Sequence, residues 1–155
     1  MFLYLTRHGE ASHSGPGAPS SLTPRGLTNV TNMAEYLSQK KKIKISTLWH
    51  SPLTRAFQTA EIYRKTFGIP AALVAEKETL APDGDFNQTY QELTHWKGGD
   101  LLIVSHLPFL PNLAALLEEG SGSSSPFSFP TAGLAAFGLG ENPKFLWSLD
   151  PSSLT

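Results

Sequence analysis

The chain has 155 residues, the length of one domain, and 40% of them are hydrophobic, which is enough to form a packed core. The 12 basic and 13 acidic residues nearly balance, so the composition gives no sign of a nucleic-acid-binding surface. The absence of cysteine excludes disulfides, a thiolate zinc site and a cysteine nucleophile. The sequence contains no apolar run long enough to predict a membrane span, and the order of apolar and basic residues at the start does not fit a secretory signal. We therefore expect a cytoplasmic protein that binds neither membrane nor nucleic acid.

Apolar runs alternate with helical patterns along the chain. The runs predict strands at 2–5, 45–50, 71–75, 101–104, 131–137 and 144–149. Helices are expected to begin at Thr23-Pro24, Ser51-Pro52 and Pro108, with a short one within 87–96. Glycine, serine and proline predict a loop at 120–130. This alternation predicts one domain over 1–155, a three-layer α/β/α sandwich with a mostly parallel sheet.

Apolar residues at helical spacing predict which face of each helix is buried. The three predicted stripes are Leu27, Val30, Ala34 and Leu37; Leu53, Phe57, Ala60 and Phe67; and Leu110, Leu113, Ala114 and Leu117. Trp49, Trp96 and Trp147 are expected to pack in the core or against the sheet.

Basic and imidazole side chains follow three of the predicted strands. Arg7 and His8 follow the first strand, Arg55 comes shortly after the second, and His106 follows the run at 101–104. Because the carboxyl ends of parallel strands meet at one edge of a sheet, we expect these four side chains to converge.

Such a cluster suits a phosphate group. A guanidinium presents a planar fork of donors and stays charged, and the starts of the helices that carry Arg55 and follow His106 add free backbone N–H groups. Two arginines oppose a metal cation, and no carboxylate or cysteine follows these strands, so neither a metal nor another cofactor is expected.

The neighbouring arginines also favour a neutral His8, which is the nucleophilic form of histidine. We hypothesise that His8 attacks phosphorus and that Arg7, Arg55 and His106 stabilise the transition state. His13, His50 and His95 are expected to be structural or surface groups. The acidic residues Glu76, Glu78, Asp83 and Asp85 are expected to be solvated, although one of the last two could donate a proton.

Several motifs resemble the histidine phosphatase, or phosphoglycerate mutase-like, superfamily. They are Leu5-Thr6-Arg7-His8-Gly9-Glu10-Ala11, Leu22-Thr23-Pro24-Arg25-Gly26, the stretch from His50 to Ala60, and Val104-Ser105-His106-Leu107-Pro108. The short length, the stretch 80–85 and the stretch 147–151 look like the SixA-type phosphohistidine phosphatases.

The resemblance implies a phosphoglycerate mutase-like fold, His8 as the phosphorylated nucleophile, and Arg7, Arg55 and His106 around the phosphate. It also implies a metal-independent hydrolase that acts in signal transduction on phosphohistidine in histidine-phosphotransfer or phosphocarrier proteins. SixA-type sequences often carry a further arginine where this chain has Ser20. Ser20 could donate one hydrogen bond there, and Arg25 is a candidate to replace the arginine.

Three functions stay open at this point. The short segment from 76 to 99 leaves little chain for a lid, which favours a phosphorylated side chain on another protein. The first function is therefore a phosphohistidine phosphatase. The second is a small-molecule phosphomonoesterase with the same nucleophile, in which Asp83 or Asp85 supplies the acid. The third is a weakly active phosphate-binding module.

Overall fold

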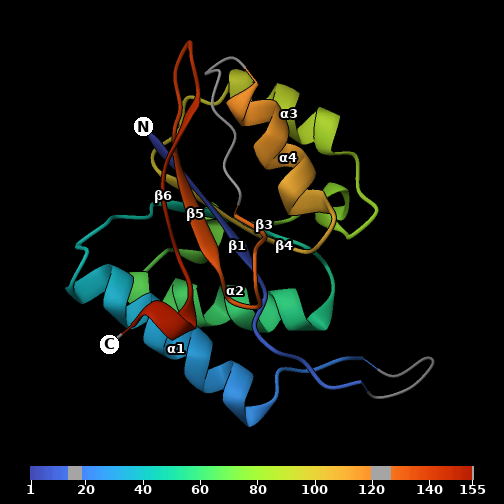
Figure 1. The fold of residues 1–155 in the computed structure, drawn as a ribbon, viewed down its shortest axis with the longest axis vertical. Helices are drawn as coiled ribbons and strands as arrows, with labels where there is room; N and C mark the ends of the chain where they lie inside the picture. The colour runs from blue at the N-terminus through green and yellow to red at the C-terminus, as the bar shows by residue number, and fades with distance from the viewer. Residues whose placement is uncertain (14–18, 120–126, 155) are drawn as a thin grey trace.

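The computed structural model describes residues 1–13, 19–119 and 127–154, and its six strands form one sheet in the order β3-β2-β4-β1-β5-β6 (Figure 1). The strands are β1 (Phe2–Arg7), β2 (Thr47–His50), β3 (Val74–Glu76), β4 (Leu101–Ser105), β5 (Leu134–Gly138) and β6 (Lys144–Leu149). Strands β3, β2, β4 and β1 run parallel, whereas β5 is antiparallel to β1 and β6 to β5. The predicted mostly parallel sheet is confirmed.

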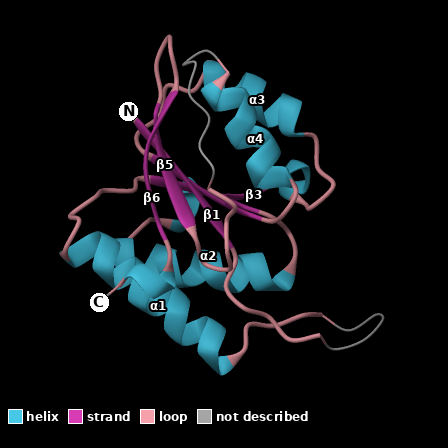
Figure 2. Ribbon diagram, in the orientation of Figure 1, coloured by secondary structure: helices cyan, strands magenta, loops and turns pink. Residues whose placement is uncertain are grey.

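Four helices cover the two faces of the sheet, as Figure 2 shows. They are α1 (Pro24–Gln39), α2 (Thr54–Phe67), α3 (Phe86–Thr94) and α4 (Phe109–Glu118). Helices α1 and α2 share one apolar cluster with Tyr4, Leu48 and Leu102 of the sheet. Helices α3 and α4 share the other with residues of the opposite face, such as Leu3 and Ile103. The predicted three-layer α/β sandwich is confirmed.

Helix α1 begins as predicted, but its first turn buries a different residue. The Thr23 side chain caps the helix by accepting a hydrogen bond from Gly26 N. Gly26 faces the protein so closely that a Cβ there would lie 2.1 Å from the backbone oxygen of Glu10. Leu27, predicted to be buried, lies at the margin of the stripe and is 46% exposed. Val30, Ala34 and Leu37 are buried as predicted.

The predicted buried face of α2 is wrong in part. Its buried residues are Ala56, Thr59, Ala60 and Tyr63, mostly small side chains that let the helix lie close to the sheet. Phe57, one position beyond Ala56, is 46% exposed, and its ring packs edge-on against His50. Leu53 and Phe67 are only half-buried. In contrast, the whole predicted stripe of α4 is buried.

Five of the six predicted strands differ in their bounds from the observed strands, and the largest differences are at β3 and β5. Residues Ala71–Leu73 form a 3-10 turn, so β3 starts only at Val74, and β5 starts at Leu134. Residues 120–126 of the predicted loop lie outside the described residues, as do 14–18. Within the described part of the chain, no helix is long and apolar enough to cross a membrane.

Strand register places three polar strand ends at the same edge of the sheet. Arg7, the last residue of β1, pairs with Ser105 at the end of β4, and His50 of β2 pairs with Val104 of β4. The residues that directly follow these strands, His8, Ser51 and His106, are therefore neighbours in space.

Candidate active site

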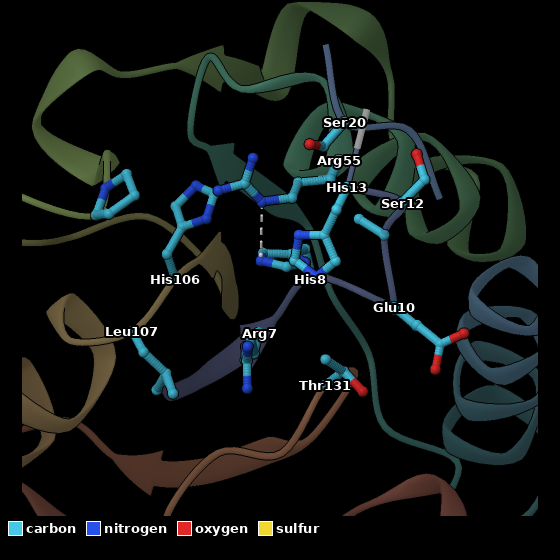
Figure 3. Close-up of a pocket in the computed structure, with 12 residues that line it drawn as sticks. Arg7, His8, Glu10, Ser12, His13, Ser20, Arg55, His106, Leu107 and Thr131 are labelled. Atoms are coloured by element: carbon cyan, nitrogen blue, oxygen red, sulfur yellow. Dashed lines mark hydrogen bonds between the residues drawn. The ribbon is translucent and has the colours of Figure 1, made fainter. Parts of the chain in front are cut away.

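A cavity of about 410 Å³ opens at this edge of the sheet. Arg7, His8, Arg55 and His106 all line it, so the structure brings together the four side chains that the sequence predicted to converge. The other residues that line it are Glu10, Ala11, Ser12, His13, Ser20, Pro82, Leu107 and Thr131. Figure 3 shows His8, Arg55 and His106 turned toward one another across the cavity.

The hydrogen bonds of His8 define its tautomer. Its Nδ1 lies 2.7 Å from Gly9 O, and because a carbonyl only accepts, Nδ1 carries the proton. Its Nε2 accepts a hydrogen bond of 3.2 Å from Nε of Arg55, drawn dashed in Figure 3. Gly9 is itself held by a hydrogen bond of 3.1 Å from its N–H to Thr59 Oγ1. The ring therefore presents the lone pair of Nε2 to the cavity.

The protein keeps the His8 ring neutral. Burial lowers its pKa to about 4, and the charges of Arg55 and Arg7 act in the same direction. The hydrogen bond to Gly9 O opposes the shift, since it favours the protonated ring, but does not outweigh burial. A neutral imidazole with an unprotonated Nε2 is a competent nucleophile at neutral pH.

The two arginines supply positive charge that no described carboxylate neutralises by an ion pair. Arg7 Nη1 donates to Phe129 O at 3.3 Å, while its buried Nε has no hydrogen-bond partner among the described residues. Burial lowers the Arg7 pKa, and the charge of Arg55 adds to this effect. Arg55 lies in the first turn of α2, where the free backbone N–H groups also attract an anion. The arrangement suits an oxyanion with several oxygens.

The second imidazole stands beside the first. The His106 ring centroid lies 5.0 Å from that of His8, and the residue is only 2% exposed. Burial lowers the pKa of His106 to about 3, with further contributions from His8, Arg55 and Arg7. Its Nε2 lies 2.7 Å from Ser51 Oγ. Both rings are thus neutral at neutral pH, and His106 is available as a hydrogen-bond donor.

The other predicted substrate-binding residues separate into two groups. Ser20 lines the cavity. Arg25 is exposed on the first turn of α1 and does not line the cavity, so the geometry gives no support to the predicted replacement of the family arginine. Asp83 and Asp85 are also exposed outside the lining, and Asp85 Oδ1 accepts a hydrogen bond from Gln88 N at the start of α3. Neither aspartate is placed to donate a proton in this cavity.

Sequence reasoning did not assign the cavity residues Glu10 and His13 to the site. Glu10 directly follows the Arg7-His8-Gly9 motif, and this position was an available signal. His13 was expected to be a structural or surface group, and it is exposed, but it also lies at the cavity, close to the pairing of Ala11 with Leu22. No local sequence pattern predicts that His13 lies at the cavity.

The Glu10 carboxylate is engaged away from the nucleophile. Its Oε1 accepts a hydrogen bond of 2.9 Å from Thr23 Oγ1, and its backbone oxygen accepts one from Thr23 N. In Figure 3 the carboxylate points away from the His8 ring and toward α1. The described part of the cavity lining therefore holds one carboxylate, and that group is bound to a helix cap.

Comparisons with known proteins agree with this geometry. A model of the histidine phosphatase superfamily (branch 1) matches residues 3–78. A solved structure of the protein histidine phosphatase SixA complexed with tungstate is 28% identical and covers 100% of both chains, with a TM-score of 0.90. A comparison with curated protein sequences found no significant match.

Two further solved structures share the fold at lower identity. The putative phosphohistidine phosphatase SixA from Agrobacterium tumefaciens is 21% identical over 97% of both chains, with a TM-score of 0.77. A putative alpha-ribazole-5'-P phosphatase from Escherichia coli K-12 is 18% identical over 94% of both chains, with a TM-score of 0.72.

Proposed function

The chain belongs to the histidine phosphatase superfamily, and on this premise we propose that it hydrolyses phosphohistidine on another protein through a phosphorylated His8. The observation that carries the proposal is the convergence on one cavity of a neutral His8, a neutral His106 and two arginines that form no ion pair with a described carboxylate. Phosphoryl transfer is catalysed mainly by positioning and by stabilisation of charge on the phosphoryl oxygens, and these side chains provide both.

In the first step, the lone pair of His8 Nε2 attacks phosphorus while the bond from phosphorus to the leaving nitrogen breaks. Arg55 Nε, now 3.2 Å from Nε2, turns to a phosphoryl oxygen as the new bond forms. The His8 ring becomes a cation because it keeps the proton on Nδ1, and Gly9 O at 2.7 Å stabilises that cation. Arg7 and His106 donate to the remaining phosphoryl oxygens.

The leaving group decides which substrate suits this site. An alkoxide leaving group needs an acid, and the only carboxylate in the described lining, that of Glu10, is bound to Thr23. A phosphohistidine ring that is protonated on its other nitrogen departs as neutral imidazole and needs no acid from the enzyme. The cavity therefore favours phosphohistidine over sugar phosphates and other alkyl phosphomonoesters.

In the second step, water attacks phosphorus and the bond from phosphorus to His8 Nε2 breaks. The electron pair returns to Nε2, and both protons of the water leave with the product, which departs as dihydrogen phosphate. The free enzyme is restored with the proton still on Nδ1. No step of this scheme uses a metal ion, so we propose that a chelator leaves the rate unchanged; a loss of activity that added metal restores would overturn this part.

We propose that the partner is a histidine-phosphotransfer or phosphocarrier protein in the cytoplasm. A purified, phosphorylated histidine-phosphotransfer domain and a set of sugar phosphates should be offered to the enzyme, and the kcat/KM values compared. The proposal predicts a clear preference for the phosphoprotein. A higher kcat/KM with sugar phosphates would instead support a phosphomonoesterase, and binding of phosphate without turnover of any substrate would support a phosphate-binding module.

A further inference from the structure

Ser51 lies directly behind His106 and is fully buried at the end of β2. Its Oγ lies 2.7 Å from Nε2 of His106 and also accepts a hydrogen bond of 3.1 Å from Leu53 N. The backbone of Ser51 is fixed by its own N–H, which donates to Val104 O. The hydroxyl therefore contacts the Nε2 edge of the second imidazole from a rigid position.

The hydrogen-bond inventory assigns the direction of this contact. The hydroxyl has one proton to donate, and the Leu53 N–H already occupies one of its lone pairs. If Nε2 of His106 carried the ring proton and donated to Oγ, the buried hydroxyl proton would have no acceptor among the contacts of the described residues. That arrangement leaves two buried groups unpaired among the described residues, the hydroxyl proton and the Nδ1 lone pair, whereas donation by Ser51 to Nε2 leaves only the proton on Nδ1 unpaired. Since an unpaired buried polar group costs about 1–3 kcal/mol, the arrangement in which Ser51 donates to Nε2 is favoured.

The neutral His106 ring then carries its proton on Nδ1. This atom is buried and has no hydrogen-bond partner among the described residues. The ring lines the cavity and stands 5.0 Å from the ring of His8. An Nδ1–H group in that place could donate to an oxygen of a phosphoryl group in the cavity, whereas a bare Nδ1 lone pair would repel the same oxygen.

We propose that Ser51 is a positioning residue, which donates to Nε2 of His106 and thereby holds the proton on Nδ1 for donation to the phosphoryl group. Ser51 does not touch the substrate; it acts through His106. The part that concerns turnover rests on the proposed function, but the tautomer of His106 is a property of the resting protein.

The tautomer is measured directly by ¹⁵N NMR of the ring nitrogens in the wild-type protein at neutral pH, with the signals of His106 assigned by their loss in His106→Ala. We expect a protonated Nδ1 and an unprotonated Nε2. A protonated Nε2 in the wild-type protein would overturn the proposal, whether or not the protein has phosphatase activity.

The matched pair Ser51→Ala and Ser105→Ala tests the consequence for turnover. Ser105 is also fully buried at a strand end beside the site, but its hydroxyl donates to Leu80 O at 2.7 Å and not to a site residue. We expect Ser51→Ala to mix the two His106 tautomers and to lower kcat roughly tenfold or more with little change in KM. Ser105→Ala should keep the wild-type tautomer and a near wild-type kcat.

Ser51→Thr keeps the hydroxyl and should restore the wild-type tautomer and most of the activity, with folding checked by thermal unfolding. If Ser51→Ala folds and keeps both the tautomer and kcat of the wild-type protein, the proposal is wrong. Lack of activity toward phosphohistidine in every variant, together with the expected NMR result, would reject the proposed function and leave the positioning role of Ser51 intact.

Discussion

Nε of Arg55 donates a hydrogen bond to Nε2 of His8 over 3.2 Å, so the nucleophilic nitrogen is paired with the charge that later stabilises its product. The two residues are 47 positions apart in the sequence: His8 directly follows β1, and Arg55 lies in the first turn of α2. This contact aligns the His8 lone pair with the cavity and helps keep the ring unprotonated.

Replacement of Arg55 should therefore lower turnover by more than the loss of one positive charge alone would. Arg55→Ala is expected to lower kcat by about a hundredfold or more, as for other donors to developing transition-state charge. Arg55→Lys should recover only part of this loss because an ammonium lacks the planar fork. Arg64→Ala serves as the control, since Arg64 is on the same helix but pairs with Glu61 away from the cavity. Equal kcat values for the Arg55 and Arg64 variants would contradict the assigned role.

The rate should depend on pH through the nucleophile. With a His8 pKa of about 4, kcat/KM should stay at the value it has at neutral pH until the pH approaches 4. Below that point it should decline, because Nε2 becomes protonated. The pH profile should be measured with two substrates whose phosphoryl groups have different pKa values. An inflection that falls at the same pH with both substrates belongs to the enzyme. A decline centred at the ordinary histidine pKa of about 6.5 would show that the site does not hold His8 neutral.

The same two histidines should make the fold sensitive to acid. In the unfolded chain they take up protons near pH 6.5, whereas in the folded protein the pKa values of His8 and His106 are lowered to about 4 and about 3. The unfolded state thus binds more protons below pH 6.5, and the free energy of unfolding should fall as the pH drops toward 4, by on the order of 2 kcal/mol per histidine.

Denaturant titrations between neutral pH and pH about 4 measure this loss. His8→Gln is expected to lose less stability over the interval than the wild type, and the exposed residue His95 supplies the control His95→Gln, which should match the wild type. A His8→Gln variant with the wild-type pH dependence would rule out the buried neutral ring as the source.

Gly26 links helix α1 to the chain that carries the nucleophile. A Cβ at this position would lie 2.1 Å from Glu10 O, a backbone atom that cannot move without shifting the segment after His8. Gly26→Ala should lower the free energy of unfolding by about 1–3 kcal/mol. The exposed Thr28→Ala on the same helix should change it by less than about 0.5 kcal/mol. A Gly26→Ala protein as stable as the wild type would contradict the close packing.

The sequence supported prediction of the elements and of the four converging side chains because both depend on local pattern. The apolar run of β4 and the stripe of α4 are local signals, and the exit residues of parallel strands share an edge as a rule of the fold. The burial of Phe57 was predicted wrongly because helical periodicity alone does not say which neighbouring face lies against the sheet.

The remaining parts of the site depend on long-range contacts. The engagement of Glu10 by Thr23, the place of His13 at the cavity and the contact between Ser51 and His106 each join segments that come together only in the folded chain. Residue spacing in the sequence does not predict such contacts. The exposure of Arg25 follows likewise from the way α1 docks through Gly26.

The location of the phosphoryl group during turnover shows directly whether His8 is the nucleophile. The enzyme should be mixed with a phosphorylated histidine-phosphotransfer domain, quenched rapidly in alkali, in which phosphohistidine survives, and digested for mass spectrometry. We expect a phosphoryl group on the peptide that contains His8 in the wild-type enzyme, and neither this adduct nor turnover in folded His8→Ala. Turnover without such an adduct, or full activity of His8→Ala, would contradict it.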